Sequence, residues 1–92
     1  MNDCSYINKN PLFQMLSKHP DWIVDELSSD GDTLKYRINK QAEGIFDLEN
    51  KESIFELMAL GLLEEVRVLN GPTGTNRLTV YKLSNILPAT FV

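Results

Sequence analysis

The sequence has little of what catalysis, metal binding and disulfide bonding require. Its 92 residues include one cysteine, Cys4, and one histidine, His19. A single cysteine forms no internal disulfide, so a reducing, cytoplasmic compartment is expected. One cysteine and one histidine provide no recognisable zinc site, and Asp30-Gly31-Asp32 is too short for a calcium loop. No glycine-rich phosphate loop ends in Lys-Ser or Lys-Thr. We therefore expect no enzyme activity, no metal and no cofactor.

Long apolar runs are also missing. No run approaches the roughly 20 residues that a helix needs to span a bilayer, so no membrane is expected as a partner. The composition is 42% hydrophobic and 24% charged, which is ordinary for a globular domain. Without repeats or linker-like segments, the chain is expected to form one domain over residues 10–84. Residues 1–9 would be an N-terminal arm, and residues 85–92 an apolar C-terminal tail.

The net charge of −4 is spread unevenly along the chain. Residues 66–92 contain Arg67, Arg77 and Lys82 and no acid, whereas all 13 acidic residues precede them. A surface that binds a phosphate backbone must be basic. The C-terminal third is therefore the part of the chain with the right sign for nucleic acid.

The apolar periodicity predicts alternating helical and strand segments. Asn10 is expected to cap a helix that starts at Pro11. In chain order we predict a helix over 10–28 that Pro20 kinks or divides, a strand over 33–38, helices over 39–46 and 51–60, and two strands around the polar loop 70–76. The predicted core consists of residues on the apolar side of their local period: Trp22, Leu27, Tyr36, Ile38, Ile54, Leu57, Leu62, Val66, Val80 and Leu83.

The stretch from residue 56 to residue 84 carries a family resemblance. It contains Leu57-Met58-Ala59-Leu60-Gly61-Leu62-Leu63, then two alternating strands, and it ends in Val80-Tyr81-Lys82-Leu83-Ser84. Gly61 lies where a helix C-terminus favours a left-handed residue. This stretch resembles the end of a winged helix-turn-helix domain. The resemblance implies an α+β fold of the order helix-strand-helix-helix-strand-strand, in which the strand over 33–38 joins the hairpin in a three-stranded antiparallel sheet.

The resemblance also implies a function. In winged-helix proteins the third helix usually enters the DNA major groove, so the leading hypothesis is a small DNA-binding regulator of transcription or replication. The expected contacts to double-stranded DNA are residues near the start of that helix and cations of the hairpin wing: Asn50, Lys51, Ser53, Arg67, Arg77 and Lys82.

Acidic residues on the same helix favour a second hypothesis. Glu49, Glu52 and Glu56 lie on the face opposite Ile54 and Leu57, where they would repel a phosphate-lined groove. The alternative is an acidic winged-helix protein-interaction module that docks these glutamates on a basic protein, as an adapter or as an inhibitor that competes with nucleic acid. A third interpretation is a solvated helix face. The apolar tail 85–92 either forms a homodimer contact or covers the core of its own chain.

Overall fold

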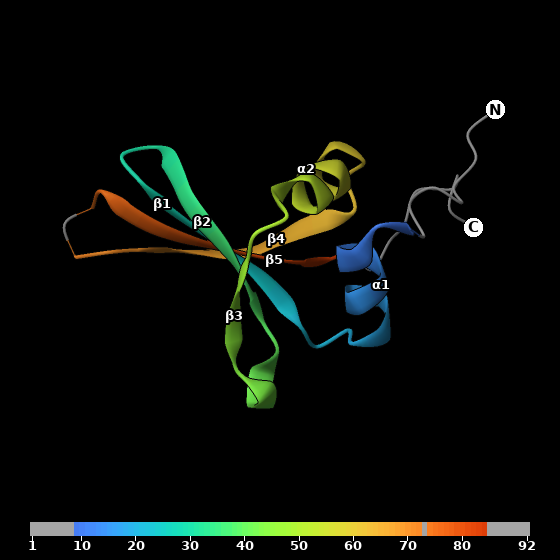
Figure 1. Cartoon of the computed structure of the whole chain (residues 1–92). Helices are drawn as coiled ribbons and strands as arrows, with labels where there is room; N and C mark the ends of the chain where they lie inside the picture. Colours follow the sequence, from blue (N-terminus) through green and yellow to red (C-terminus); the bar gives the residue numbers. More distant parts are fainter. Residues whose placement is uncertain (1–8, 73, 85–92) are drawn as a thin grey trace.

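The computed structural model describes residues 9–72 and 74–84, which form two helices and a five-stranded sheet (Figure 1). The elements are α1 (Pro11–Lys18), β1 (Ile23–Ser29), β2 (Asp32–Asn39), a 3₁₀ turn (Gln41–Glu43), β3 (Ile45–Leu48), α2 (Lys51–Ala59), β4 (Leu63–Asn70) and β5 (Asn76–Leu83). The strand order is β3-β2-β1-β5-β4, and all neighbouring strands are antiparallel.

Both helices pack on the same side of the sheet. Val24 of β1 is in register with Ile38 of β2 and with Tyr81 of β5, so these side chains share one side. Val24 and Ile38 lie in one buried cluster with Leu16 of α1 and Leu57 of α2. We call this side the helix side of the sheet. The opposite side, which neither helix covers, is called the open side.

The winged-helix arrangement predicted from the sequence is wrong. The protein is α+β, but its described part has two helices rather than three, and its sheet has five strands rather than three. The strand predicted over 33–38 does form, as β2, but β2 does not pair with the hairpin of β4 and β5. Instead β1 lies between β2 and β5 and is paired along both edges.

β1 replaces the second half of the helix predicted over 10–28. Pro20 disfavours a helical conformation at the residue before it, and α1 ends at Lys18. Ile23 and Val24 are β-branched and fit a paired strand. Beyond the strand, Asp30 and Gly31 both have positive φ, at 53° and 84°, as a two-residue hairpin turn requires. The Asp-Gly pair therefore joins β1 directly to β2.

β3 replaces the helix predicted over 39–46. Gly44 has φ +111° and accepts a hydrogen bond at its carbonyl oxygen from the Lys40 amide at 2.8 Å, so the chain reverses after the short 3₁₀ turn. Ile45 and Phe46 then pair with Asn39 and Ile38 of β2. A glycine in this conformation cannot continue a helix.

Other predicted elements are confirmed. The Asn10 side chain caps α1 by accepting from the Phe13 amide at 2.9 Å. α2 forms as expected and is followed by Gly61 in the left-handed conformation at φ +72°. Its end is closed by a hydrogen bond from the Leu62 amide to the Leu57 carbonyl at 2.9 Å. β4 and β5 form the predicted hairpin.

Most of the predicted core is buried. Seven of the ten predicted residues are at most 7% exposed: Trp22, Tyr36, Ile38, Ile54, Leu57, Leu62 and Val80. Leu27 and Leu83 are only partly buried. Val66 is 49% exposed and lies at a bulge, where the β4 register shifts between Glu65 and Arg67. The core also includes Leu12, Leu16 and Val24, which were not on the predicted list.

Candidate functional site

The three cations predicted to contact DNA from the wing do not share a surface. The strand register places Arg77 on the helix side, with Ser28 of β1, whereas Arg67 and Lys82 lie on the open side. Lys82 is 3.9 Å from a carboxylate oxygen of Glu64. The hairpin therefore divides its positive charge between two sides of the sheet and pairs part of it.

Residues at the start of α2 serve the fold. The Asn50 side chain caps α2 by accepting from the Ser53 amide at 3.4 Å, and Ser53 is buried. The Ser53 carbonyl in turn accepts a hydrogen bond from Asn10 Nδ2 at 3.0 Å. Lys51 is exposed. Of the three residues at the start of α2 predicted to contact DNA, only Lys51 has an exposed side chain that does not cap the helix. A role of the three residues in nucleic-acid binding stays a prediction.

The acidic residues of α2 have different surroundings. Glu49 and Glu52 are exposed. Glu56 is partly buried, and its Oε1 accepts a hydrogen bond from Asn10 Nδ2 at 2.7 Å. Glu52 and Glu56 line a cavity of about 240 Å³ together with Asn10 and Asn50. Glu56 therefore holds α1 against α2, which leaves Glu49 and Glu52 as the exposed acids of the predicted partner surface.

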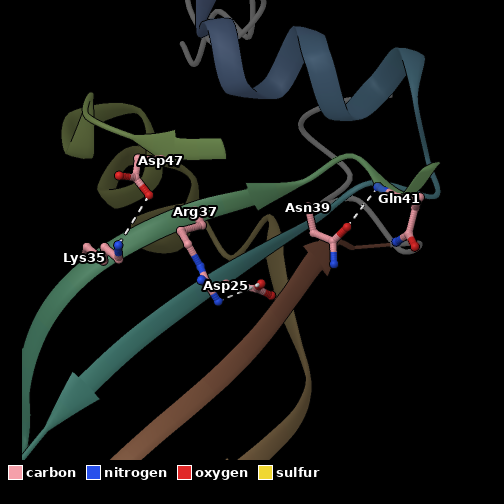
Figure 2. Close-up of polar contacts among 6 residues, drawn as sticks. All are labelled: Asp25, Lys35, Arg37, Asn39, Gln41 and Asp47. Atoms are coloured by element: carbon pink, nitrogen blue, oxygen red, sulfur yellow. Dashed lines mark hydrogen bonds and ion pairs between the residues drawn. The ribbon is translucent and has the colours of Figure 1, made fainter. Parts of the chain in front are cut away.

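The open side carries a row of paired charges (Figure 2). Lys35 Nζ lies 3.6 Å from Asp47 Oδ1, and Arg37 Nη2 lies 3.8 Å from Asp25 Oδ2. Burial raises the pKa of the Asp25 carboxyl above its ordinary value of 3.8, while the charges of Arg37 and Arg67 act to lower it. Nε of Arg37 is buried and has no hydrogen-bond partner within residues 9–72 and 74–84. Cation and carboxylate thus neutralise each other along this side.

A polar groove lies on the helix side, near the ends of the two long hairpins. These ends project together to the left in Figure 1, away from both helices, and the Asp30 amide joins them by donating to the Thr75 carbonyl at 2.9 Å. The groove has a volume of about 410 Å³. Its lining residues come from all four strands of the two hairpins and include Glu26, Asp30, Glu65, Arg77, Thr79 and Tyr81.

Two tyrosines lie beside the acidic residues of the groove. Tyr36 donates from its hydroxyl to Glu26 Oε2 at 2.6 Å, and burial together with this contact raises the pKa of Tyr36 well above its ordinary range. Burial, and then the charges of Glu26 and Glu65, raise the pKa of Tyr81. Both phenols therefore stay protonated at neutral pH, and Tyr36 is the hydrogen-bond donor to Glu26.

The groove has an excess of negative charge, and an exposed aromatic ring packs against Tyr36, the residue that donates to Glu26 of its lining. Three carboxylates, those of Glu26, Asp30 and Glu65, face one guanidinium, that of Arg77. Phe55 of α2 is 52% exposed and packs edge-on against Tyr36, with 6.1 Å between ring centroids. We call this groove, lined by Glu26, Asp30, Glu65 and Arg77, the acidic groove. It suits a ligand that carries positive charge and an apolar part.

Sequence reasoning did not find the acidic groove. The sequence pattern predicts Glu26 within a helix and Glu65 and Tyr81 within the hairpin, so it does not bring these residues together. Glu26, Thr79 and Tyr81 meet because β1 pairs with β5. The one local signal was Asp30-Gly31, which marks a two-residue hairpin and thereby a strand on both of its sides.

Comparisons with protein-family models, curated proteins and solved structures returned no match. Among the described residues, no helix has the length and apolar content needed to cross a membrane.

Proposed function

We propose that this chain is a protein-interaction module that binds a basic polypeptide segment in the acidic groove. The observation that carries the proposal is the excess of carboxylates over cations in a groove of about 410 Å³, with tyrosine hydroxyls beside them. Lysine or arginine side chains of a partner would pair with Glu26 and Glu65. Their aliphatic parts, or a neighbouring apolar residue, would pack near Phe55.

The distribution of cations favours a protein partner over DNA. Lys35, Arg37 and Lys82 lie 3.6, 3.8 and 3.9 Å from carboxylate oxygens of this chain, so DNA phosphates would have to displace those carboxylates. Phosphate contacts supply most of the nonspecific affinity for DNA. A homodimer contact through tail 85–92, also predicted from the sequence, lies outside the described residues. The single cysteine leads us to propose a reducing compartment, the cytoplasm.

The affinity for one segment is expected to be modest. Interfaces of about 1,600 Å² range from micromolar to picomolar dissociation constants. A short segment in this groove would bury less surface than that, and its charge pairs are largely exposed to water, where each contributes about 0.2–1 kcal/mol. We therefore expect a dissociation constant no tighter than about 1 μM.

Fluorescence anisotropy tests the proposal directly. A labelled peptide of alternating lysine and valine residues, a matched peptide of glutamate and valine, and a nonspecific DNA duplex are each titrated with the full chain in a salt series. We expect saturable binding of the lysine peptide that weakens as salt rises, with no binding of the glutamate peptide. Tighter binding of DNA than of the lysine peptide, with a steep salt dependence, would instead support a nucleic-acid partner.

A further inference from the structure

The outer edge of β4 is long, exposed and unpaired. β4 pairs with β5 along one edge, and no strand in the described part of the chain pairs with its other edge. Seven of its eight residues are exposed, from Glu64 to Asn70. Unpaired amides and carbonyls along such an edge are a template for another strand. The opposite edge of the sheet, β3, has only four residues.

The side chains of β4 alternate in a pattern that the bulge at Val66 modifies. Before the bulge, Leu63 shares the helix side with Leu83, and Glu64 shares the open side with Lys82. After the bulge, Arg67 lies on the open side with Val80, and Val68 lies on the helix side with Thr79. The two halves of β4 therefore present an acid and a cation to the same side of the sheet.

This arrangement is complementary to itself. Consider a second β4 placed antiparallel along the free edge, with a two-fold axis perpendicular to the sheet between Glu65 and Val66. Glu64 then lies opposite Arg67 of the second copy, and Leu63 lies opposite its Val68. Because the axis is two-fold, each of these pairs occurs twice. Both pairs join residues on the same side of the sheet, as strand pairing requires.

We propose that two copies of this chain associate through the outer edges of β4, in this register, to form a continuous ten-stranded antiparallel sheet. Charged residues and bulges usually protect an edge strand from pairing. Here the two charges have opposite sign and matching positions, so they select a second copy. The contact would bury apolar surface of three residues that are now exposed to solvent: Val66 (49% exposed), Val68 (38%) and Leu69 (48%).

The proposal does not require a ligand in the acidic groove, although Glu65 and Val68 of the groove lining belong to β4. Its test is the mass of the full chain. Sedimentation equilibrium across a dilution series is expected to show a monomer–dimer equilibrium. Arg67→Glu replaces the two attractive pairs with two repulsive pairs of glutamates. Glu64→Arg replaces them with two repulsive pairs of arginines. Each variant is expected to weaken dimerisation at least about tenfold.

Combining the charges restores the pairing and makes the test specific for this register. The double variant Glu64→Arg/Arg67→Glu is expected to dimerise like the original chain, and an equimolar mixture of the two single variants is expected to form a heterodimer. Arg77→Glu makes the same charge change on β5, away from this edge, and serves as the control that keeps the dimer.

Several results would overturn the proposal. One is a chain that stays monomeric up to about 1 mM. Another is a dimer that Arg67→Glu and Glu64→Arg leave unchanged, which would place the contact elsewhere, for instance at the tail 85–92. Loss of the dimer in both single variants without recovery in the mixture would exclude the proposed register. Circular dichroism identifies any variant that fails to fold, and the other single variant then decides the outcome.

Discussion

Replacing Asn10 with alanine removes three side-chain hydrogen bonds, one that caps α1 and two that join the start of α1 to α2. Asn10 is 5% exposed; its Oδ1 accepts from the Phe13 amide at 2.9 Å, and its Nδ2 donates to the Ser53 carbonyl at 3.0 Å and to Glu56 Oε1 at 2.7 Å. Loss of a helix cap costs about 1 kcal/mol. A hydrogen bond to a charged group contributes about 1.5–3 kcal/mol, and one between neutral groups about 0.5–1.5 kcal/mol.

One side chain makes all three contacts, so the losses do not add fully. We expect Asn10→Ala to lower the free energy of unfolding by about 3 kcal/mol. For a domain of this size, this corresponds to a fall in melting temperature of about 12–24 °C. Trp22, the single tryptophan, is buried and reports unfolding in urea by its fluorescence. The slope of the unfolding free energy against urea should stay unchanged, because the surface exposed on unfolding is the same.

Two further variants separate the parts of this effect. Asn50 also caps a helix, but it is exposed and makes one hydrogen bond at 3.4 Å, so Asn50→Ala should cost at most about 1 kcal/mol. Asn10→Ser retains a capping oxygen and loses the two donated bonds, and its cost should fall between the other two. If Asn10→Ala costs no more than Asn50→Ala, Asn10 does not hold the two helices together.

Three other changes test the core, the open side and the groove. Leu57 is fully buried, so Leu57→Ala should lower the unfolding free energy measured in urea by about 2–5 kcal/mol. Leu69 is 48% exposed, so Leu69→Ala should lower it by less than about 1 kcal/mol. Equal losses in the two variants would show that the core is misassigned. Burial raises the pKa of Asp25, so its contribution to stability is complete below pH 3.8 and is lost as pH rises through the raised value. We therefore compare the unfolding free energy of the original chain with that of Asp25→Asn across a pH series. The advantage of the original chain over the variant should fall as pH rises above 3.8. An advantage that grows with pH would mean that the charges of Arg37 and Arg67 affect the pKa of Asp25 more than burial does. Tyr36→Phe removes the 2.6 Å hydrogen bond to Glu26 and should cost about 1–3 kcal/mol in the same urea assay; an unchanged midpoint would show that this contact does not hold the groove lining.

Elements with strong local signals could be predicted from the sequence. Asn10 before Pro11 marked the start of α1, and Gly61 marked the end of α2, because capping depends on a few neighbouring residues. The hairpin of β4 and β5 follows from alternation on both sides of a polar loop. Each of these signals lies within a few residues of the element that it specifies.

β1 could not be identified by apolar spacing. Trp22, Val24 and Leu27 also fit a helical face, and Val24 and Asp25 are both buried, so the strand lacks the in–out alternation of a half-exposed strand. Its buried environment comes from β2 and β5 on its two edges. Tertiary pairing overrides the local helical pattern here, and the Asp30-Gly31 turn was the evidence that favoured a strand.

The acidic groove depends on the same long-range pairing. Glu26 is opposite Thr79 and next to Tyr81 only in the β1–β5 register. Local periodicity assigns residues to a side of a strand, but it does not say which strands become neighbours. Without β1, no local pattern connects Glu26 to Glu65, whereas the acids of α2 lie on one face of a helix that the sequence does predict.

Binding in the acidic groove is tested most directly by comparing two pairs of glutamates for their effect on binding of the lysine–valine peptide. Glu26→Gln/Glu65→Gln neutralises the acidic groove while glutamine at position 26 still accepts from Tyr36. Glu49→Gln/Glu52→Gln makes an equal charge change on exposed residues of α2. We expect the groove variant to weaken peptide binding about tenfold and the α2 variant to change it less than about twofold. Equal weakening by both variants, or weakening by the α2 variant alone, would contradict binding in the groove.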